Sequence, residues 1–174
     1  MAHYRTTKPE GENALYGDFS TIQGTEEFIQ SYLSRYKETD ILINNVGSYF
    51  IAPASLTPSE VCHELFQTNL HAPLALIQAL KPKQIINIGV SGSHLPHANT
   101  YATLYGMAKL SLYMLTKSLA KEGMHINMVS PGHMENSIDL QDKPFVTFGE
   151  VAEAIEFLLN NPSITGQNIE VVKR

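Results

Sequence analysis

Tyr105 and Lys109 are the residues whose types and spacing best fit proton-transfer chemistry. They lie four residues apart in a helical pattern that runs from about 103 to 121, so the two side chains share one helix face. An unperturbed phenol titrates near ~10, and a neighbouring ammonium favours the phenolate and lowers the pKa of the phenol toward neutral pH. The pair is therefore a candidate site for general acid–base catalysis.

The spacing does not select this pair by itself, because short motifs recur by chance. Tyr4 with Lys8 and Tyr113 with Lys117 have the same separation, and the second of these pairs belongs to the same helical pattern. The elements that carry each pair must therefore decide among them.

Short apolar runs alternate with amphipathic stretches along the chain. Runs typical of buried strands cover 40–47, 84–91, 125–130 and 169–172, with shorter candidates at 2–4 and 14–19. Helical periodicity covers 25–37, 59–80, 103–121 and 148–160. We expect Thr25 to cap the first helix and Pro73 to kink or divide the second. The alternation predicts a parallel sheet covered by helices, an α/β fold.

The predicted strands end in clusters of polar and small residues. These clusters are 44–47, 89–93 and 131–132. Ligands of open parallel sheets bind at the carboxyl ends of the strands, so the three clusters converge on one edge. A helix that follows the second cluster brings Tyr105 and Lys109 to that edge, whereas Tyr113 and Lys117 lie two turns further along. The predicted topology therefore selects Tyr105 and Lys109.

Composition narrows the class of protein. The chain has 174 residues, 43% of them hydrophobic, which fits one domain over 1–174. A net charge of −5 with no basic block argues against nucleic-acid and anionic-membrane partners and favours a small-molecule substrate. Cys62 is the only cysteine, and we see no signal-peptide core and no apolar run of the ~18 residues that span a membrane. We expect a cytoplasmic protein without a membrane segment.

The motifs, taken in order, resemble those of classical short-chain dehydrogenases/reductases over about 4–172. The matching elements are Asn44-Asn45-Val46-Gly47, Asn69, Ser91 or Ser93, Tyr105-x-x-x-Lys109, Pro131-Gly132 and Ile164-Thr165-Gly166-Gln167. The resemblance implies a Rossmann-like three-layer parallel sheet that binds NAD(P). It also implies an oxidoreductase that reduces a carbonyl or imine-like group by hydride transfer from NADP(H), with NAD as the alternative cofactor.

The same resemblance implies catalytic roles. Tyr105 would be the general acid, and Lys109 would lower its pKa and bind the nicotinamide ribose. Ser91 would hydrogen-bond the substrate carbonyl, with Ser93 as the alternative, because Val90 stands where the family usually has its serine. Asn69 would hold a water of the proton relay.

Cofactor contacts follow from the same comparison. Those implied are Asn45, Val46 and Gly47 along the cofactor, Asp18 near the adenine, and Pro131, Gly132 and His133 beside the nicotinamide. The segment from His3 to Thr7 is similar to that of NADP-dependent members, especially pteridine reductases, so Arg5 would grip the 2′-phosphate. Pteridine-like and 3-oxoacyl-like substrates both stay open.

One departure from the family is large. None of the 11 glycines forms Gly-x-Gly-x-x-Gly, the turn that holds a pyrophosphate. The resemblance then implies that the first strand, its helix and most of the second strand lie upstream of Met1, and that a gap opens between the strands at Ala14 and Ile41. A second hypothesis is therefore a truncated, catalytically inactive member that acts as a dimerising or binding module. The helices at 59–80 and 103–121 imply a homodimer or homotetramer.

Two other motifs are weaker. Gly89-Val90-Ser91-Gly92-Ser93 departs from the hydrolase elbow Gly-x-Ser-x-Gly at its fifth position, and no histidine follows Asp139. His94-x-x-His97 offers two metal ligands without a third, so we predict no metal site.

Overall fold

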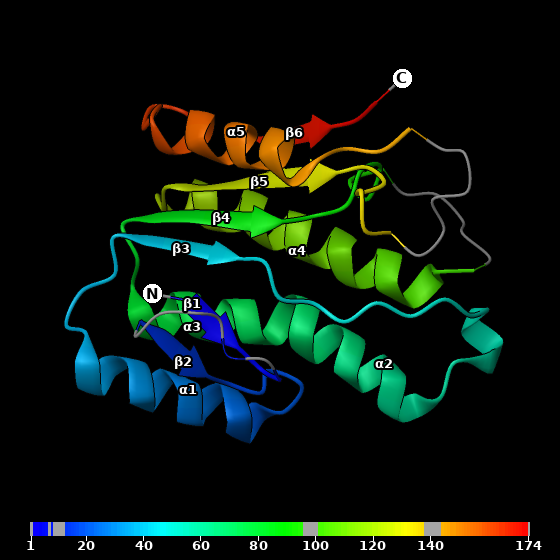
Figure 1. Cartoon of the computed structure of the whole chain (residues 1–174), viewed down its shortest axis with the longest axis horizontal. Coiled ribbons are helices and arrows are strands. Elements are labelled where there is room, and N and C mark those ends of the chain that lie inside the picture. Colours follow the sequence, from blue (N-terminus) through cyan, green and yellow to red (C-terminus); the bar gives the residue numbers. More distant parts are fainter. Residues whose placement is uncertain (1, 7, 9–12, 96–100, 138–143, 174) are drawn as a thin grey trace.

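The structure is a computed structural model that describes residues 2–6, 8, 13–95, 101–137 and 144–173. Its strands are β1 (Ala2–Tyr4), β2 (Ala14–Tyr16), β3 (Ile41–Asn44), β4 (Gln84–Ile88), β5 (Ile126–Pro131) and β6 (Asn168–Val171). Its α-helices are α1 (Ile22–Arg35), α2 (Ser59–Phe66), α3 (Ala72–Leu80), α4 (Thr103–Lys121) and α5 (Phe148–Leu159). A 3₁₀ turn covers Ala54–Leu56, and a π-helical turn, Gln67–His71, joins α2 to α3. The alternation predicted from the sequence is confirmed (Figure 1).

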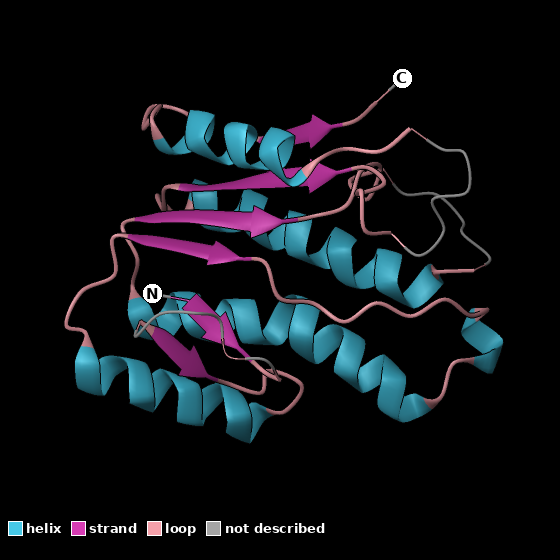
Figure 2. Ribbon diagram, in the orientation of Figure 1, coloured by secondary structure: helices cyan, strands magenta, loops and turns pink. Residues whose placement is uncertain are grey.

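The strands form two parallel sheets. Four of them pair in the order β3-β4-β5-β6, and β1 pairs with β2 (Figure 2). In the larger sheet Ile43 lies opposite Ile86, and Ile86 lies opposite Asn127. The arrangement confirms the Rossmann-like α/β class with parallel strands.

Alternate residues of β4 pack against helices on opposite faces of the sheet. Ile85 packs with Ile77 of α3 and Leu119 of α4. Ile86, the next residue, packs with Leu158 of α5. Because successive side chains of a strand point to opposite faces, this pairing defines three layers: α3 and α4, the sheet, and α5.

A cavity of about 380 Å³ separates the two sheets. His3 of β1 lines one side, and Ile41, Leu42 and Ile43 of β3 line the other. Among the described residues no strand lies between β1 and β3, so the expected gap is present. Its border differs from the expectation: β1, and not the strand at Ala14, faces β3 (Figure 1).

Helix α4 has the bounds that its apolar period predicts, whereas α1 differs from expectation at its start. Helix α1 begins at Ile22, and the Oγ1 atom of its N-cap Thr21 accepts a hydrogen bond from the amide of Gly24. Thr25 is therefore not the cap: it is buried within the first turn, and its hydroxyl donates to the Thr21 carbonyl. The expected division at Pro73 is present, because the π-helical turn ends one residue before α3, and Pro73 lies in the first turn of α3.

None of the helices within the described ranges is long and apolar enough to cross a membrane.

Candidate active site

Helix α4 places Tyr105 in its first turn and Lys109 one turn later, at the carboxyl end of β4. The Nζ atom of Lys109 lies 5.8 Å from the centre of the Tyr105 ring. The same ammonium is buried and donates a 2.8 Å hydrogen bond to the carbonyl oxygen of Ile88. In contrast, Lys117 donates to the carbonyl of Gly166. The pair chosen from the sequence is therefore the one that meets the end of a core strand.

The pKa values in this pair differ from the sequence-based expectation. Burial, and secondly the nearby Tyr49 phenol, raise the pKa of Tyr105 to about 12. Burial also lowers the pKa of Lys109 to about 8. The expectation that Lys109 lowers the pKa of Tyr105 is not met in the structure, because the loss of solvent and the Tyr49 phenol both move this pKa upward. Tyr105 is thus a protonated donor at neutral pH.

Tyr49 is a member of the site that the sequence did not reveal. Its ring packs edge-to-face on Tyr105, with centroids 4.7 Å apart and an interplanar angle of 82°. It lies in the loop after β3, a stretch for which the sequence pattern predicts no helix or strand. The available signal was its position two residues after the Asn-Asn-Val-Gly cluster. Nothing in that spacing predicted the contact with Tyr105.

Asn69 lies in the π-helical turn and is fully buried. Its Nδ2 donates 2.9 Å hydrogen bonds to the carbonyl oxygens of Ser48 and Leu65. Its Oδ1 has no hydrogen-bond partner among the described residues. Gly47 approaches this oxygen so closely that an added Cβ would lie 2.2 Å from it. The turn therefore aims a buried acceptor at the backbone that follows β3, and π-helical turns of this kind are frequent at functional sites.

Ser91 and Ser93 follow β4 in a loop tied to neighbouring strands. The amide of Ser91 donates a 2.8 Å hydrogen bond to the Pro131 carbonyl, and the amide of Gly92 donates to Glu170 of β6. Ser91 is half-buried, whereas Ser93 is only 7% exposed, and its Oγ has no partner among the described residues. Both serines stay candidates for the hydroxyl.

The ends of β4 and β5 meet directly through the Ser91–Pro131 hydrogen bond. Beyond Pro131, the amide of Gly132 donates to the Val171 carbonyl, and the carbonyl of His133 accepts from Val146. On the other side of β4, Asn45 and Val46 line the cavity between the sheets. The predicted cofactor residues that follow β3 and β5 therefore lie along the carboxyl edge of the larger sheet, whereas Arg5 and Asp18 follow the strands of the smaller sheet.

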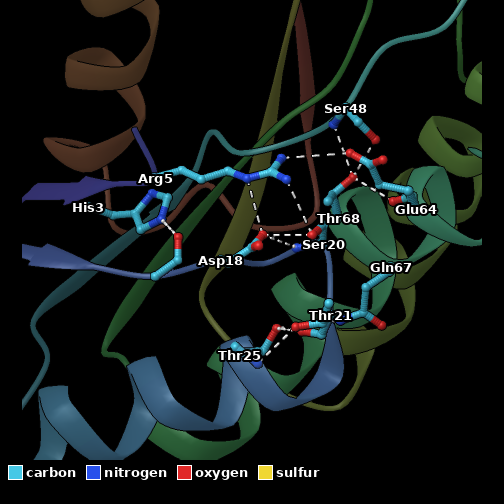
Figure 3. A network of polar contacts seen from close by, with 12 residues as sticks. His3, Arg5, Asp18, Ser20, Thr21, Thr25, Ser48, Glu64, Gln67 and Thr68 are labelled. Carbon is cyan, nitrogen blue, oxygen red and sulfur yellow. Dashed lines mark hydrogen bonds and ion pairs between the residues drawn. The ribbon is translucent and has the colours of Figure 1, made fainter. Parts of the chain in front are cut away.

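Arg5 and Asp18 come together, as Figure 3 shows. The Nε atom of Arg5 lies 3.2 Å from Asp18 Oδ1, and Nη1 lies 3.8 Å from Glu64 Oε1 on α2 (Figure 3). The pKa of Asp18 lies below its usual value, mainly because Ser20 donates hydrogen bonds to the carboxylate and to a smaller extent because of the Arg5 charge. The guanidinium is half-exposed between two carboxylates. A phosphate bound at Arg5 would therefore share the guanidinium with Asp18 and compete with Glu64 for it.

The sequence pattern also does not predict a buried chain of hydrogen-bonded polar side chains. Asn44 Nδ2 donates to Asn87 Oδ1 at 2.8 Å, and Asn87 Nδ2 donates to Thr116 Oγ1 at 2.9 Å. These bonds join β3, β4 and α4. They hold in register the elements that carry the polar cluster after β3 and the Tyr105 helix.

Of the two histidines in His94-x-x-His97, the structure describes the first. The Nδ1 atom of His94 lies 3.3 Å from Glu170 Oε1, whereas His97 lies outside the described residues. Within the described ranges no group of three or more His, Cys, Asp or Glu side chains comes close enough to hold a metal ion.

Comparison with known proteins gives a consistent result. The family model described as short chain dehydrogenase matches residues 5–143. Carbonyl reductase family member 4 of Xenopus tropicalis is 30% identical over 180 residues, which cover 91% of this chain and 75% of that protein. The 3-oxoacyl-acyl-carrier-protein reductase of rhamnolipid biosynthesis from Pseudomonas aeruginosa is 31% identical over 135 residues, which cover 68% of this chain and 52% of that protein.

A solved structure shares the fold. The blue fluorescent protein from a metagenomic library, crystallised in complex with NADPH, superposes with a TM-score of 0.80 at 22% identity. The match covers 91% of this chain and 73% of that chain. The match covers a larger share of this chain than of that protein. The metagenomic protein therefore contains segments that these 174 residues do not match.

Proposed function

The chain belongs to the short-chain dehydrogenase family, and on that basis we propose that it is an NADP(H)-dependent oxidoreductase that reduces a carbonyl or imine-like group. The observation that carries the proposal is the buried Lys109 beside the Tyr105 ring, at the carboxyl edge of a parallel sheet. The NADPH complex of a structurally similar protein supports NADP, and NAD is the alternative.

The residues at the sheet edge fit a nicotinamide cofactor. Gly47 lets the backbone lie close to Asn69, because any Cβ there would meet this side chain. The Oδ1 atom of Asn69 has no hydrogen-bond partner among the described residues and would accept a hydrogen bond from a water or ligand. Arg5 offers a guanidinium to a 2′-phosphate and Asp18 a carboxylate near the adenine. Asn45 and Val46 would line the cofactor, while Pro131, Gly132 and His133 flank its nicotinamide. When bound, the cofactor supplies the hydride.

The side chains of this protein manage the proton. Tyr105 donates its phenol proton to the substrate oxygen as negative charge develops there. Its raised pKa keeps the proton in place until that moment. The ammonium of Lys109 stabilises the resulting phenolate. Ser91 or Ser93 donates a second hydrogen bond to the same oxygen, and Asn69 holds a water that returns the proton.

The relatives support one substrate class over another. A carbonyl reductase and a 3-oxoacyl reductase, 30% and 31% identical to this chain, favour a 3-oxoacyl-like or other carbonyl compound. A pteridine-like substrate is the second choice, because it rests on the His3 to Thr7 segment alone. Both substrates belong in the same assay.

A binding or dimerising module without catalysis is the competing proposal. Ile41 and Ile43 of β3 face the cavity between the sheets and are both more than two-fifths exposed. No Gly-x-Gly-x-x-Gly turn is present in the chain to hold a pyrophosphate. Met107 and Met114 are exposed on α4, so a homodimer or homotetramer formed through α2 and α4 fits either function.

Titration with NADPH separates the two proposals. A reductase binds NADPH with saturable quenching or enhancement of its fluorescence, and a matched titration with NADH reports the preference. Arg5→Ala serves as the control, because a genuine 2′-phosphate contact makes this variant weaker for NADPH and unchanged for NADH. Failure to bind NADPH at about millimolar concentration, where typical cofactor sites are filled, excludes a working reductase.

A further inference from the structure

The ring of Tyr49 packs edge-to-face on the ring of Tyr105, the proposed proton donor. The edge of one ring meets the face of the other at 82°, with the centroids 4.7 Å apart. Tyr49 is 50% exposed and Tyr105 is partly buried, so Tyr49 is the outer ring of the pair. Tyr49 therefore lies between Tyr105 and solvent on the side of the loop after β3.

The loop that carries Tyr49 is held on both sides. On one side, the Ser48 amide donates to Thr68 Oγ1 at 3.0 Å, and the two hydroxyls are 2.8 Å apart (Figure 3). The Ser48 carbonyl also accepts from the buried Asn69 amide. On the other side, Ala52 forms a parallel bridge with Ala102, the residue that precedes α4.

These anchors tie Tyr49 to the elements that carry Tyr105. Three residues, 49–51, separate the two anchored positions. Ala102 directly precedes the turn of α4 that holds Tyr105, so the bridge joins the loop to the start of that helix. The contact between the rings is therefore a property of the fold and not of a free surface side chain.

Among the described residues, the charged and titratable groups in contact with Tyr105 come from two elements. Lys109, on α4 itself, has its ammonium 5.8 Å from the ring centre and hydrogen-bonded to Ile88. Tyr49, from the loop after β3, presents a second phenol. Burial is the larger cause of the raised pKa of Tyr105, and Tyr49 the smaller. Part of that burial is supplied by Tyr49, because its ring covers Tyr105.

We propose that Tyr49 is a positioning residue for Tyr105: it holds the phenol in one orientation and keeps bulk water from the ring. The catalytic consequence rests on the proposed reductase function, whereas the structural consequence does not. Removing the outer ring frees the inner one, hydrates it and eases its ionisation.

NMR titration of protein labelled with ¹³Cζ-tyrosine tests the proposal without any ligand. Tyr105→Phe identifies the resonance of Tyr105. We compare the parent with Tyr49→Ala, Tyr49→Leu and Tyr49→Phe, and follow the fold by circular dichroism at each pH. The matched control is Tyr16→Ala, which removes a 56%-exposed tyrosine from another edge-to-face pair, with Tyr4, at 5.9 Å.

The expected result is graded. Tyr105 stays protonated in the parent to about pH 11, as its raised pKa requires, and Tyr49→Ala increases its ionisation constant at least roughly threefold. Tyr49→Phe retains the ring and gives a smaller change, whereas Tyr16→Ala gives none. An unchanged Tyr105 titration in folded Tyr49→Ala overturns the proposal. If that variant does not fold, an unchanged titration in Tyr49→Leu, which keeps much of the apolar volume, overturns it equally.

A kinetic arm tests the consequence for catalysis. With a reducible substrate, Tyr49→Ala lowers kcat and shifts the pH profile, while the affinity for NADPH stays that of the parent. Loss of NADPH binding in the parent itself refutes the reductase function but leaves the NMR result standing. A changed titration together with an unchanged kcat and pH profile shows that Tyr49 does not position the donor for reaction.

Discussion

The ammonium of Lys109 is buried beneath the ring of Tyr105 and is hydrogen-bonded to the carbonyl oxygen of Ile88 at 2.8 Å. A cation that gives up solvent for one carbonyl and one aromatic ring is destabilised, which is why the pKa of Lys109 falls to about 8. The protein keeps this charge at a cost to its stability. That cost is expected where a charge serves a site and not the fold.

Replacing Lys109 by Met should reveal the cost as a dependence of stability on pH. Lysine in the unfolded chain stays protonated to a pKa of 10.5, whereas in the folded chain it loses its proton near 8. The unfolded state therefore binds more protons between these values, and the parent gains stability as the pH rises through them. Urea unfolding should show the parent gaining about 1–3 kcal/mol relative to Lys109→Met from about pH 7 to about pH 10. A constant difference between the two proteins contradicts a depressed pKa.

Alanine should be harmful at one glycine near the site, Gly47, and stabilising at another, Gly106. In Gly47→Ala the new Cβ would lie 2.2 Å from Asn69 Oδ1, so the backbone after β3 must move. NADPH affinity should then fall at least about tenfold, as a displacement at a binding backbone predicts. Gly106→Ala, within α4, meets nothing within 4 Å and should stabilise the protein by about 0.5–1 kcal/mol. Thermal unfolding and NADPH titration of both variants check this, and equal effects would refute the role of Gly47.

Glu64 should oppose phosphate binding at Arg5. Its carboxylate lies 3.8 Å from the guanidinium and competes with an incoming 2′-phosphate. Glu64→Gln should tighten NADPH by a few-fold and leave NADH unchanged, with little effect on stability, because an exposed ion pair contributes about 0–1 kcal/mol. Calorimetric titration with both cofactors measures the ratio. The control is Glu38→Gln, whose carboxylate pairs with Lys83 at 3.5 Å instead of Arg5. An equal gain for NADH would place the effect outside the 2′-phosphate.

Sequence reasoning succeeded where periodicity and strand ends carried the information. The nineteen-residue helical pattern predicts the observed bounds of α4, and the polar clusters that follow β3, β4 and β5 lie at one edge of the sheet. The choice of Tyr105 and Lys109 followed from topology, because only that pair begins the helix after β4. These features depend on short-range patterns that survive without knowledge of packing.

Features that depend on long-range contacts were not accessible in the same way. The ring contact of Tyr49 joins residues 49 and 105, and the Asn44–Asn87–Thr116 chain joins three separate elements. The direction of the Tyr105 pKa was missed because spacing reports the nearby charge but not the burial that outweighs it. Thr21 was overlooked as a cap because Thr25 has an equally suitable side chain and stands before two glutamates.

The comparison of Tyr105→Phe with the parent tests proton donation by this phenol most directly. NADPH consumption is followed with a 3-oxoacyl thioester and with an oxidised pteridine, and the dissociation constant for NADPH is measured for both proteins. We predict turnover of at least one substrate by the parent, a loss of about 10²–10⁴-fold in kcat in Tyr105→Phe, and equal NADPH affinity. Equal turnover by both proteins, or a parent that does not bind NADPH, would contradict it.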